Sequence, residues 1–486
     1  MADAGPGRVV APTLTDPVAR SMSEVVGGPV GRHGRPHRWW TPVRVLLAVF
    51  TVVFALGLVQ KAPCIGSDWN SDTVRYSRMC YSDVPYLYTG RGLAERQWPY
   101  SDGGRPGRYP AMEYPVGIAY VAWVASELTG LVATGPPEAQ RAATAPANIW
   151  GMPGMATEIN SYFLITAVLL FGAGLVATWF LAGVHRRRPW DAMAFALSPA
   201  LLLAGLVNWD LLAVACTAGA LWAWSRGRPV WAGVLVGLGT ATKLYPLFLL
   251  GAFLVVAVRR RRPVWAAYAL GGAVLAWLLA QVPAWATGGF DRWSVFWTFN
   301  ADRGPDLGSL WLVAQDAGHG ASAHTVNVVS GLVFAACCVA ILGLGLRVQH
   351  PPRVAQVAYL VTVSFLLVNK VYSPQYVLWL LPLAVLARPR WRDQLVWQAA
   401  EVFYFGMVWI YLGGWLQGSS GTGSPAYDAA IVVRAAAELG LAALVVRDMV
   451  RPEHDPARVL DAAAGPCVEA DPMTPLPSVT RPTPAT

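Results

Sequence analysis

Long apolar runs separated by short polar segments fill most of the chain between residues 43 and 446. About 20 apolar residues cross a bilayer as a helix, and fewer suffice where a neighbouring helix covers one end. The pattern predicts an all-α polytopic membrane protein with about twelve transmembrane helices, within a range of about 11–13. The predicted crossings are 43–61, 160–184, 191–207, 209–225, 229–243, 245–258, 264–284, 326–346, 354–369, 374–388, 396–414 and 427–446.

Basic clusters follow every second crossing, and they predict the orientation of the chain. Arginines precede the first crossing, and the later clusters lie at 185–188, 225–228, 259–262, 347–353, 387–392 and 447–451. Cytoplasmic loops carry an excess of Lys and Arg, so we assign these clusters to the cytoplasm. Both termini are then cytoplasmic. Residues 1–40 and 448–486 read as disordered tails that flank a transmembrane domain at 41–447.

Residues 115–134 are also apolar enough to cross. A crossing there would place the later basic clusters on the opposite side unless another run stays out of the membrane. We therefore expect a juxtamembrane or partly inserted helix at 115–134, with a thirteenth crossing as the alternative.

The composition agrees with a membrane protein. Of the 486 residues, 55% are hydrophobic and only 13% are charged, against about 25% charged in ordinary soluble domains. The net charge of +9 would suggest nucleic-acid binding in a soluble protein. Here the arginines sit in short loops between apolar runs, so the charge reflects membrane orientation and we expect no nucleic-acid partner.

Nearly all polar side chains capable of chemistry fall on the predicted exterior side. A charge at the bilayer centre costs roughly 2.5–3.5 kcal/mol, so charged residues near crossings usually face a cavity. This clustering predicts a site that opens to the exterior of the cell membrane. The residues are Asp68, Asp72, Asp83, Glu95, Asp102, Glu113, Asp210, Lys243, Arg303, Asp306, Lys370 and Gln375.

The first exterior loop, 62–114, is longer than most connectors and is rich in aromatic residues. After Asp83, the spacing of apolar residues predicts an amphipathic helix on the membrane surface. Cys64 and Cys80 lie in the same stretch, where they either form a disulfide on an oxidising side or stay as two thiols. A second large exterior loop is predicted at 286–325.

Several motifs together resemble a known family. An acid precedes the predicted surface helix, the first loop ends in "EYP", and "NWD", "TKLYP", "ADRGPDLGSLW" and "NKVYSPQY" follow. This combination resembles the GT-C superfamily of polytopic glycosyltransferases. It is most similar to glycosyltransferase family 87, the actinobacterial α-1,2-mannosyltransferase type that uses polyprenyl-phosphate sugars. The resemblance covers roughly residues 43–445.

The resemblance implies a hexosyltransferase. Such an enzyme moves a sugar, here expected to be mannose, from a polyprenyl-phosphate donor to a glycolipid or cell-envelope glycan on the exterior face. Arabinose is the variant within the same class. The family places its catalytic base early in the first loop. Asp83 in "SDVPYLY" matches best, with Asp68 and Asp72 as alternatives, and an N-cap is the structural alternative for Asp83.

The departing phosphate requires positive groups. Arg303 is the first choice, because its guanidinium suits bidentate phosphate contact; an ion pair with Asp306 is its alternative. Lys243 and Lys370 are further candidates that could instead only extend to the interface. Further residues expected to bind sugar or acceptor are Glu113, Asp210, Tyr86, Tyr372 and Gln375.

Neither a cofactor nor a metal site is predicted, because the histidines lack carboxylate neighbours at ligand spacing. The "NKVYSPQY" region also lacks the late-helix histidine that has a role in some relatives. The alternative from another class is a transporter or lipid flippase, which would place polar residues at the membrane midplane.

Overall fold

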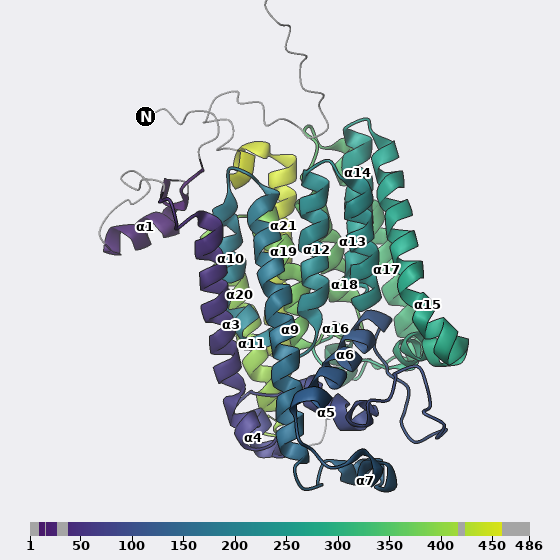
Figure 1. Ribbon diagram of the computed structural model, residues 1–486. Helices are drawn as coiled ribbons and strands as arrows, with labels where there is room; N and C mark the ends of the chain where they lie inside the picture. Colours follow the sequence, from purple (N-terminus) through teal and green to yellow (C-terminus); the bar gives the residue numbers. More distant parts are fainter. Residues whose placement is uncertain (1–8, 15, 27–36, 417–422, 459–486) are drawn as a thin grey trace, which may run out of the picture.

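The computed structural model describes residues 9–14, 16–26, 37–416 and 423–458 (Figure 1). Within them the regular structure is entirely helical, which confirms the predicted all-α polytopic membrane fold. Six helices are long and apolar enough to cross a membrane. They are α3 (Pro42–Gly66), α9 (Met155–Val184), α15 (Pro263–Asp302), α17 (Ala323–Arg347), α20 (Trp391–Leu412) and α21 (Pro425–Val450).

Shorter apolar helices pack among the long ones. They are α6 (Val116–Val132), α12 (Asp210–Ser225), α13 (Pro229–Thr242), η4 (Tyr245–Phe248) with α14 (Leu249–Arg259), α18 (Val354–Val368), and η5 (Pro374–Tyr376) with α19 (Val377–Ala387).

The bundle has two distinct ends. The arginine-rich loops 185–188, 225–228, 259–262, 347–353 and 387–392 lie together at what we call the basic end, uppermost in Figure 1. The opposite end, called the loop end, carries the first loop with α4 (Asp72–Ser77), α5 (Asp83–Gly90), η2 (Leu93–Glu95), α7 (Glu138–Ala143) and α8 (Pro146–Ile149).

Some helices stop short of the loop end, and we call the region around their ends, at Asp210 and Lys243, the recess. At 1.5 Å per residue, the 16 residues of α12 span about 24 Å and the 30 residues of α9 about 45 Å. The two helices pack together and are joined at the basic end, where Arg226 donates to the Gly183 carbonyl over 2.6 Å. The start of α12, at Asp210, therefore lies inside the outline of the bundle.

The predicted crossing at 191–207 is not one helix. It is divided into η3 (Pro189–Ala192), α10 (Met193–Ala196) and α11 (Pro199–Ala204). Pro199 cannot donate a backbone hydrogen bond, and Ser198 caps α11 by accepting from the Leu201 N–H over 3.1 Å. The Ser198 hydroxyl also donates to the Gln398 side chain over 2.7 Å, so the break is satisfied inside the protein.

Helix α6, in the segment 115–134, has contacts with loop-end residues at both of its ends. Gly117 lies against Ala241 and Thr242 at the end of α13, and Gly130 lies against the Arg96 side chain. The helix therefore stays within the loop-end layer, where it packs on α9, α13 and α15.

Helices α13 and α15 approach each other at backbone distance. A Cβ atom at Gly237 would lie 2.2 Å from the Ala273 carbonyl oxygen, and one at Gly233 would lie 1.9 Å from that of Ala269. Residues four apart share one helix face, and small residues at this spacing let membrane helices pack closely. This contact fixes α15 against the short helices that surround the recess.

The region 286–325 was predicted to be a loop, but α15 continues through it to Asp302. Gly289 interrupts the helix with φ 63° and ψ −173°, and the residues after it turn aside at the loop end (Figure 1). The turned part rests on the first loop, because Arg292 donates to the Ser101 carbonyl over 2.9 Å. Helix α16 (Leu310–Asp316) follows before α17.

The first loop also differs from the prediction of a surface helix. Helix α5 buries Leu87 and Tyr88 against the protein, and it packs on α9. The Tyr88 hydroxyl hydrogen-bonds to Glu158, which forms a buried ion pair with Arg141 over 2.7 Å. Cys64 at the end of α3 forms a disulfide with Cys80, 16 residues later.

Disorder was predicted for both tails, but parts of them are packed at the basic end. Residues before the first crossing form η1 (Pro12–Leu14) and α1 (Pro17–Val26), and the Asp16 carboxylate accepts from the Trp391 N–H over 2.9 Å. Beyond α21, η6 (Pro452–His454) leads to Asp455, which pairs with Arg353 over 2.9 Å. A hydrogen bond to Asp16 and the ion pair of Asp455 attach these residues to the bundle, whereas 1–8, 15, 27–36 and 459–486 lie outside the described residues.

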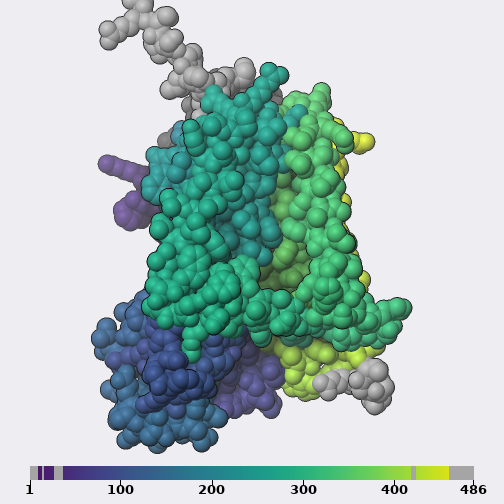
Figure 2. Space-filling view, turned by 90° about the vertical axis from the view of Figure 1, so that its right-hand side faces the viewer, coloured from purple at the N-terminus to yellow at the C-terminus, as the bar shows by residue number. Residues whose placement is uncertain are grey.

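One face of the bundle is hollowed. Figure 2 shows this hollow between α15, in teal, and α17, in green. Most of α17 is exposed along this face, including Leu332 and Val339. An exposed apolar helix of this kind is suited to contact with lipid.

Candidate functional site

Asp83 stands at the start of α5, but it does not cap the helix. Ser82 is the N-cap, and its hydroxyl accepts from the Val84 N–H over 3.3 Å. The Asp83 N–H donates to the Val207 carbonyl over 2.8 Å, so the first loop is joined to the chain just before α12. The Asp83 carboxylate is therefore available for contacts other than capping.

Three side chains donate to that carboxylate. The Tyr81 hydroxyl donates to Oδ1 over 2.8 Å, and the Asn208 amide donates to Oδ2 over 2.7 Å. The Tyr114 hydroxyl lies 3.3 Å from Oδ2 and 3.1 Å from the Asn208 amide nitrogen. These contacts fix the orientation of a carboxyl group that remains partly accessible.

A second charged pair lies beside Asp83. Lys243 Nζ is 3.6 Å from Asp210 Oδ1, and the same oxygen accepts from the Trp379 indole N–H over 2.6 Å. The Lys243 ammonium lies 5.3 Å from the centre of the Tyr114 ring and 5.9 Å from that of Tyr376. The "NWD", "TKLYP" and "EYP" motifs thus meet at one place in the recess.

The surroundings of Asp83 favour a proton acceptor. Burial is the largest influence and raises the pKa of its carboxyl above the ordinary value. Hydrogen bonds from Tyr81 and Asn208 oppose this rise, as does the charge of Lys243. Burial also raises the pKa of the Tyr114 hydroxyl well above its ordinary value, so that hydroxyl stays protonated and continues to donate. A carboxylate with a raised pKa is a better general base.

The alternative acids of the first loop lie elsewhere. Asp72 is 77% exposed and pairs with Arg75 within α4. Asp68 is also exposed, and its nearest hydrogen-bond partner is the Asn160 amide at 3.5 Å. Neither carboxylate contacts the group around Asp83.

Arg303 and Lys370 lie on two loops that are hydrogen-bonded to each other. The Asp306 N–H donates to the Lys370 carbonyl over 2.8 Å, and the Tyr372 N–H donates to the Leu307 carbonyl over 2.9 Å. Arg303 pairs with Asp306 and keeps about a third of its side chain exposed. The Lys370 ammonium donates to the Ala301 carbonyl over 3.0 Å, and burial, aided by the charge of Arg303, lowers its pKa.

The group around Asp83 and the loop that carries Arg303 are both near Tyr376. Asp83, Asp210 and Arg303 are all close enough to act electrostatically on its hydroxyl. The Tyr376 ring stacks on Trp379 with 3.9 Å between ring centres. The base candidate and the exposed guanidinium therefore border the same recess.

Other sequence-selected residues have different surroundings. Glu113 forms a bidentate pair with Arg91, with distances of 2.6 and 2.7 Å. The Tyr86 hydroxyl donates to the Trp69 carbonyl, and its ring stacks on Tyr81 at 5.4 Å, so it supports the Asp83 group from outside. The Tyr372 hydroxyl donates to Glu438 over 2.5 Å, away from the recess, and Gln375 is buried in η5.

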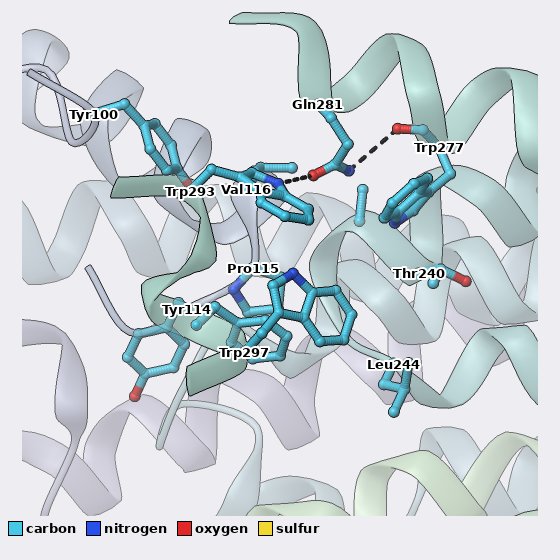
Figure 3. Close-up of a pocket in the computed structure, with 12 residues that line it drawn as sticks. Tyr100, Tyr114, Pro115, Val116, Thr240, Leu244, Trp277, Gln281, Trp293 and Trp297 are labelled. Carbon is cyan, nitrogen blue, oxygen red and sulfur yellow. Dashed lines mark hydrogen bonds between the residues drawn. The ribbon is translucent and has the colours of Figure 1, made fainter. Parts of the chain in front are cut away.

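An aromatic pocket adjoins the base candidate. It lies between α13, the start of α6 and both parts of α15. Figure 3 shows Tyr114 at its edge, with the hydroxyl directed away from the pocket. The Trp293 indole donates to the Gln281 side chain over 2.8 Å. The other lining residues are Tyr100, Pro115, Val116, Thr240, Ala241, Leu244, Trp277, Phe296 and Trp297.

Sequence reasoning selected the right motifs but missed several residues in them. Glu113 and Asp210 were chosen from "EYP" and "NWD", whereas Tyr114 and Asn208 of the same motifs contact Asp83. Lys61, within an apolar run, was not selected although it lies beside this group. Within the described part of the chain, no group of three or more His, Cys, Asp or Glu side chains is placed to hold a metal ion.

The family comparison agrees with this architecture. The model for glycosyltransferase family 87 matches residues 114–369, just over half of the chain. With the all-helical fold, this match indicates a polytopic membrane glycosyltransferase, which uses a sugar donor and a glycan acceptor. The chain belongs to glycosyltransferase family 87. Asp83 precedes the matched segment, while Tyr114, Asn208, Asp210, Lys243 and Arg303 lie within it. No curated protein matched the chain.

Proposed function

We propose that the chain transfers a mannosyl residue from a polyprenyl-phosphate donor to a lipid-linked or cell-envelope glycan on the exterior face of the cell membrane. The observation that carries this proposal is the placement of Asp83 in the recess. Its carboxylate accepts hydrogen bonds from three neutral groups. The loops that carry Arg303 and Lys370 lie near it, and so does the aromatic pocket.

Asp83 acts as the general base. It takes the proton of an acceptor hydroxyl while that oxygen attacks the anomeric carbon of the donor sugar. The bond from the anomeric carbon to the phosphate oxygen breaks, and polyprenyl phosphate leaves with the bonding electron pair. Tyr114 and Asn208 hold the base in place throughout, because both donate to the same carboxylate oxygen.

Arg303 binds the departing phosphate. Its guanidinium is partly exposed at the recess, and a phosphate can replace Asp306 as its partner. Lys370 adds positive charge nearby, while Lys243 is held by Asp210 and acts on the base side of the site. Preorganised charge at a leaving group is usually the larger part of such catalysis.

Further features support the assignment of the site to the exterior face and the lipid nature of the donor. The basic loops face the cytoplasm, because cytoplasmic loops are enriched in Lys and Arg, so the loop end faces the exterior. The aromatic pocket at Tyr114 provides an apolar wall for the isoprenoid or sugar part of the donor. The hollow between α15 and α17 gives a lipid substrate access from the bilayer (Figure 2).

The test is sugar transfer by the purified chain in lipid vesicles. Radiolabelled polyprenyl-phosphomannose and polyprenyl-phosphoarabinose are supplied separately, with envelope glycolipids as acceptors. We expect transfer of mannose, and Asp83→Asn should lower kcat by about 10²–10⁴-fold. Asp72→Asn is the matched control, since this acid lies in the same loop but points to solvent.

Four results would contradict parts of the proposal. Transfer of arabinose alone would replace the sugar, and no transfer from either donor would refute the polyprenyl-phosphate dependence. An Asp83→Asn variant with activity equal to that of Asp72→Asn would refute the base. Chemical labelling of a single cysteine introduced at Asp72 from the cytoplasmic side only would refute the orientation.

A further inference from the structure

Lys61 is a buried charge with no role in the mechanism above. It lies near the loop end of α3, in a largely apolar helix, and it is 0% exposed. Its ammonium donates to the Tyr81 carbonyl over 2.9 Å. Among the described residues no carboxylate lies within 4 Å of it, although Asp83 is near enough to interact electrostatically. An ionisable residue inside a membrane helix is costly and usually functional.

The same face of α3 holds the segment that leads to the base. The Gln60 amide donates to the Met79 carbonyl over 2.6 Å and to that of Arg78 over 3.3 Å. Cys64 is linked to Cys80 by the disulfide. Together with the bond from Lys61 to Tyr81, these contacts attach residues 78–81 to α3 immediately before Asp83.

We propose that Lys61 is a positioning residue for the base: it fixes Tyr81, whose hydroxyl donates to Asp83, and its ammonium stabilises the charged carboxylate. This inference rests on the proposed role of Asp83. Gln60 and the disulfide hold the same segment without adding charge, so only Lys61 combines a mechanical contact with an electrostatic one.

The charges around Asp83 determine how the effect of Lys61 should be measured. The carboxyl accepts hydrogen bonds from the hydroxyls of Tyr81 and Tyr114 and from the Asn208 amide. The charged groups near enough to act on it electrostatically are the Asp210 carboxylate and the ammonium groups of Lys243 and Lys61. Asp210 disfavours the charged form of Asp83, whereas both lysines favour it. Removing one of two favourable charges should therefore raise the pKa of Asp83, so the acidic limb of kcat/KM against pH should move upward.

The experiment compares Lys61→Met, Lys61→Arg and Gln60→Leu in vesicles, with the donor and acceptor that support wild-type transfer. For Lys61→Met we expect kcat to fall about 10–100-fold. The KM for the donor should stay within about twofold, because the phosphate site is not part of this contact. The acidic limb should move up by roughly 0.5–1 pH unit, because an opposite charge has been removed.

The two controls separate charge from mechanical support. Lys61→Arg keeps the charge, so its acidic limb should stay at the wild-type position. Gln60→Leu loosens the same segment without changing its charge, so its kcat can fall but its acidic limb should not move. If Lys61→Met does not insert stably, Lys61→Gln keeps a hydrogen-bond donor without the charge and should show the same shift.

The outcomes distinguish this inference from the proposed function. A wild-type acidic limb in Lys61→Met or Lys61→Gln would overturn the electrostatic role of Lys61. If Asp83→Asn is inactive while both Lys61 variants behave as wild type, the base stands and the inference fails. If Asp83→Asn is fully active, the base assignment fails and the inference fails with it.

Discussion

Arg434 is the buried charge whose removal should perturb the protein most clearly. It is 1% exposed on α21, and its guanidinium lies between the rings of Tyr372 and Tyr404, 3.6 and 3.7 Å from their centres. It donates to the carbonyls of Gly308 and Tyr372. These two residues belong to the hydrogen-bonded loops that carry Arg303 and Lys370, so Arg434 holds both loops on the bundle.

Replacing Arg434 with methionine removes these contacts together. The variant loses two hydrogen bonds from a charged donor, each worth about 1.5–3 kcal/mol, and two buried cation–π contacts. It also removes the positive charge beside Glu438 and Glu401, which are both buried. Losing the two hydrogen bonds alone would cost about 3–6 kcal/mol, and we expect about 3–5 kcal/mol because the separate terms are not additive. Over a chain of this length it corresponds to a fall in melting temperature of roughly 3–5 °C.

The assay combines thermal unfolding in detergent with transfer kinetics in vesicles. Arg434→Met should lower the melting temperature and raise the KM for the donor by about tenfold, since the loops with the phosphate-binding groups are no longer held. Arg434→Lys should be intermediate, because an ammonium cannot stack or donate as a planar fork. Val433→Met is the matched control, because Val433 is its exposed neighbour. A variant with wild-type melting and wild-type donor KM would refute this reasoning.

Three further predictions test the site and the packing. The proposed mechanism requires ionised Asp83, so activity should be lost as pH falls through its raised pKa, and a wild-type acidic limb at or below the ordinary value of 3.8 would contradict this. Arg303→Ala should raise the donor KM with little change in acceptor KM, and an effect confined to the acceptor would reverse the assignment. Gly237→Leu should destabilise the chain by about 1–3 kcal/mol, whereas Gly271→Leu, where nothing lies within 4 Å, should melt as wild type.

The sequence was sufficient for the membrane fold because hydrophobic length is a local property. Each apolar run could be recognised without its neighbours, and most helices of the structure follow those runs, with 191–207 and the extension of α15 as exceptions. Asp83 could also be selected, since an acid ahead of a helix in the first loop is a local pattern. What the pattern did not decide was whether Asp83 caps the helix, and the structure assigns that role to Ser82.

Residues that act across the bundle could not be selected in the same way. Asn208 and Tyr114 lie 125 and 31 positions from Asp83, and only the folded chain brings their side chains to its carboxylate. Glu113, chosen from the sequence, is instead held by Arg91. The hydrogen-bond partner of each side chain depends on which residue of a motif faces the recess. A short motif cannot specify this.

The sequence by itself determined that this chain is a polytopic membrane protein and predicted that its candidate site lies at one end of the helices. Hydrophobic length and the alternation of basic loops are sufficient for that, because both depend only on the order of residues. The tertiary structure alone decided that α12 begins and α13 ends inside the bundle, that α15 turns at Gly289, and that buried Lys61 contacts the segment before Asp83. These features arise from packing between distant segments, whose contacts are set by shape and charge in three dimensions.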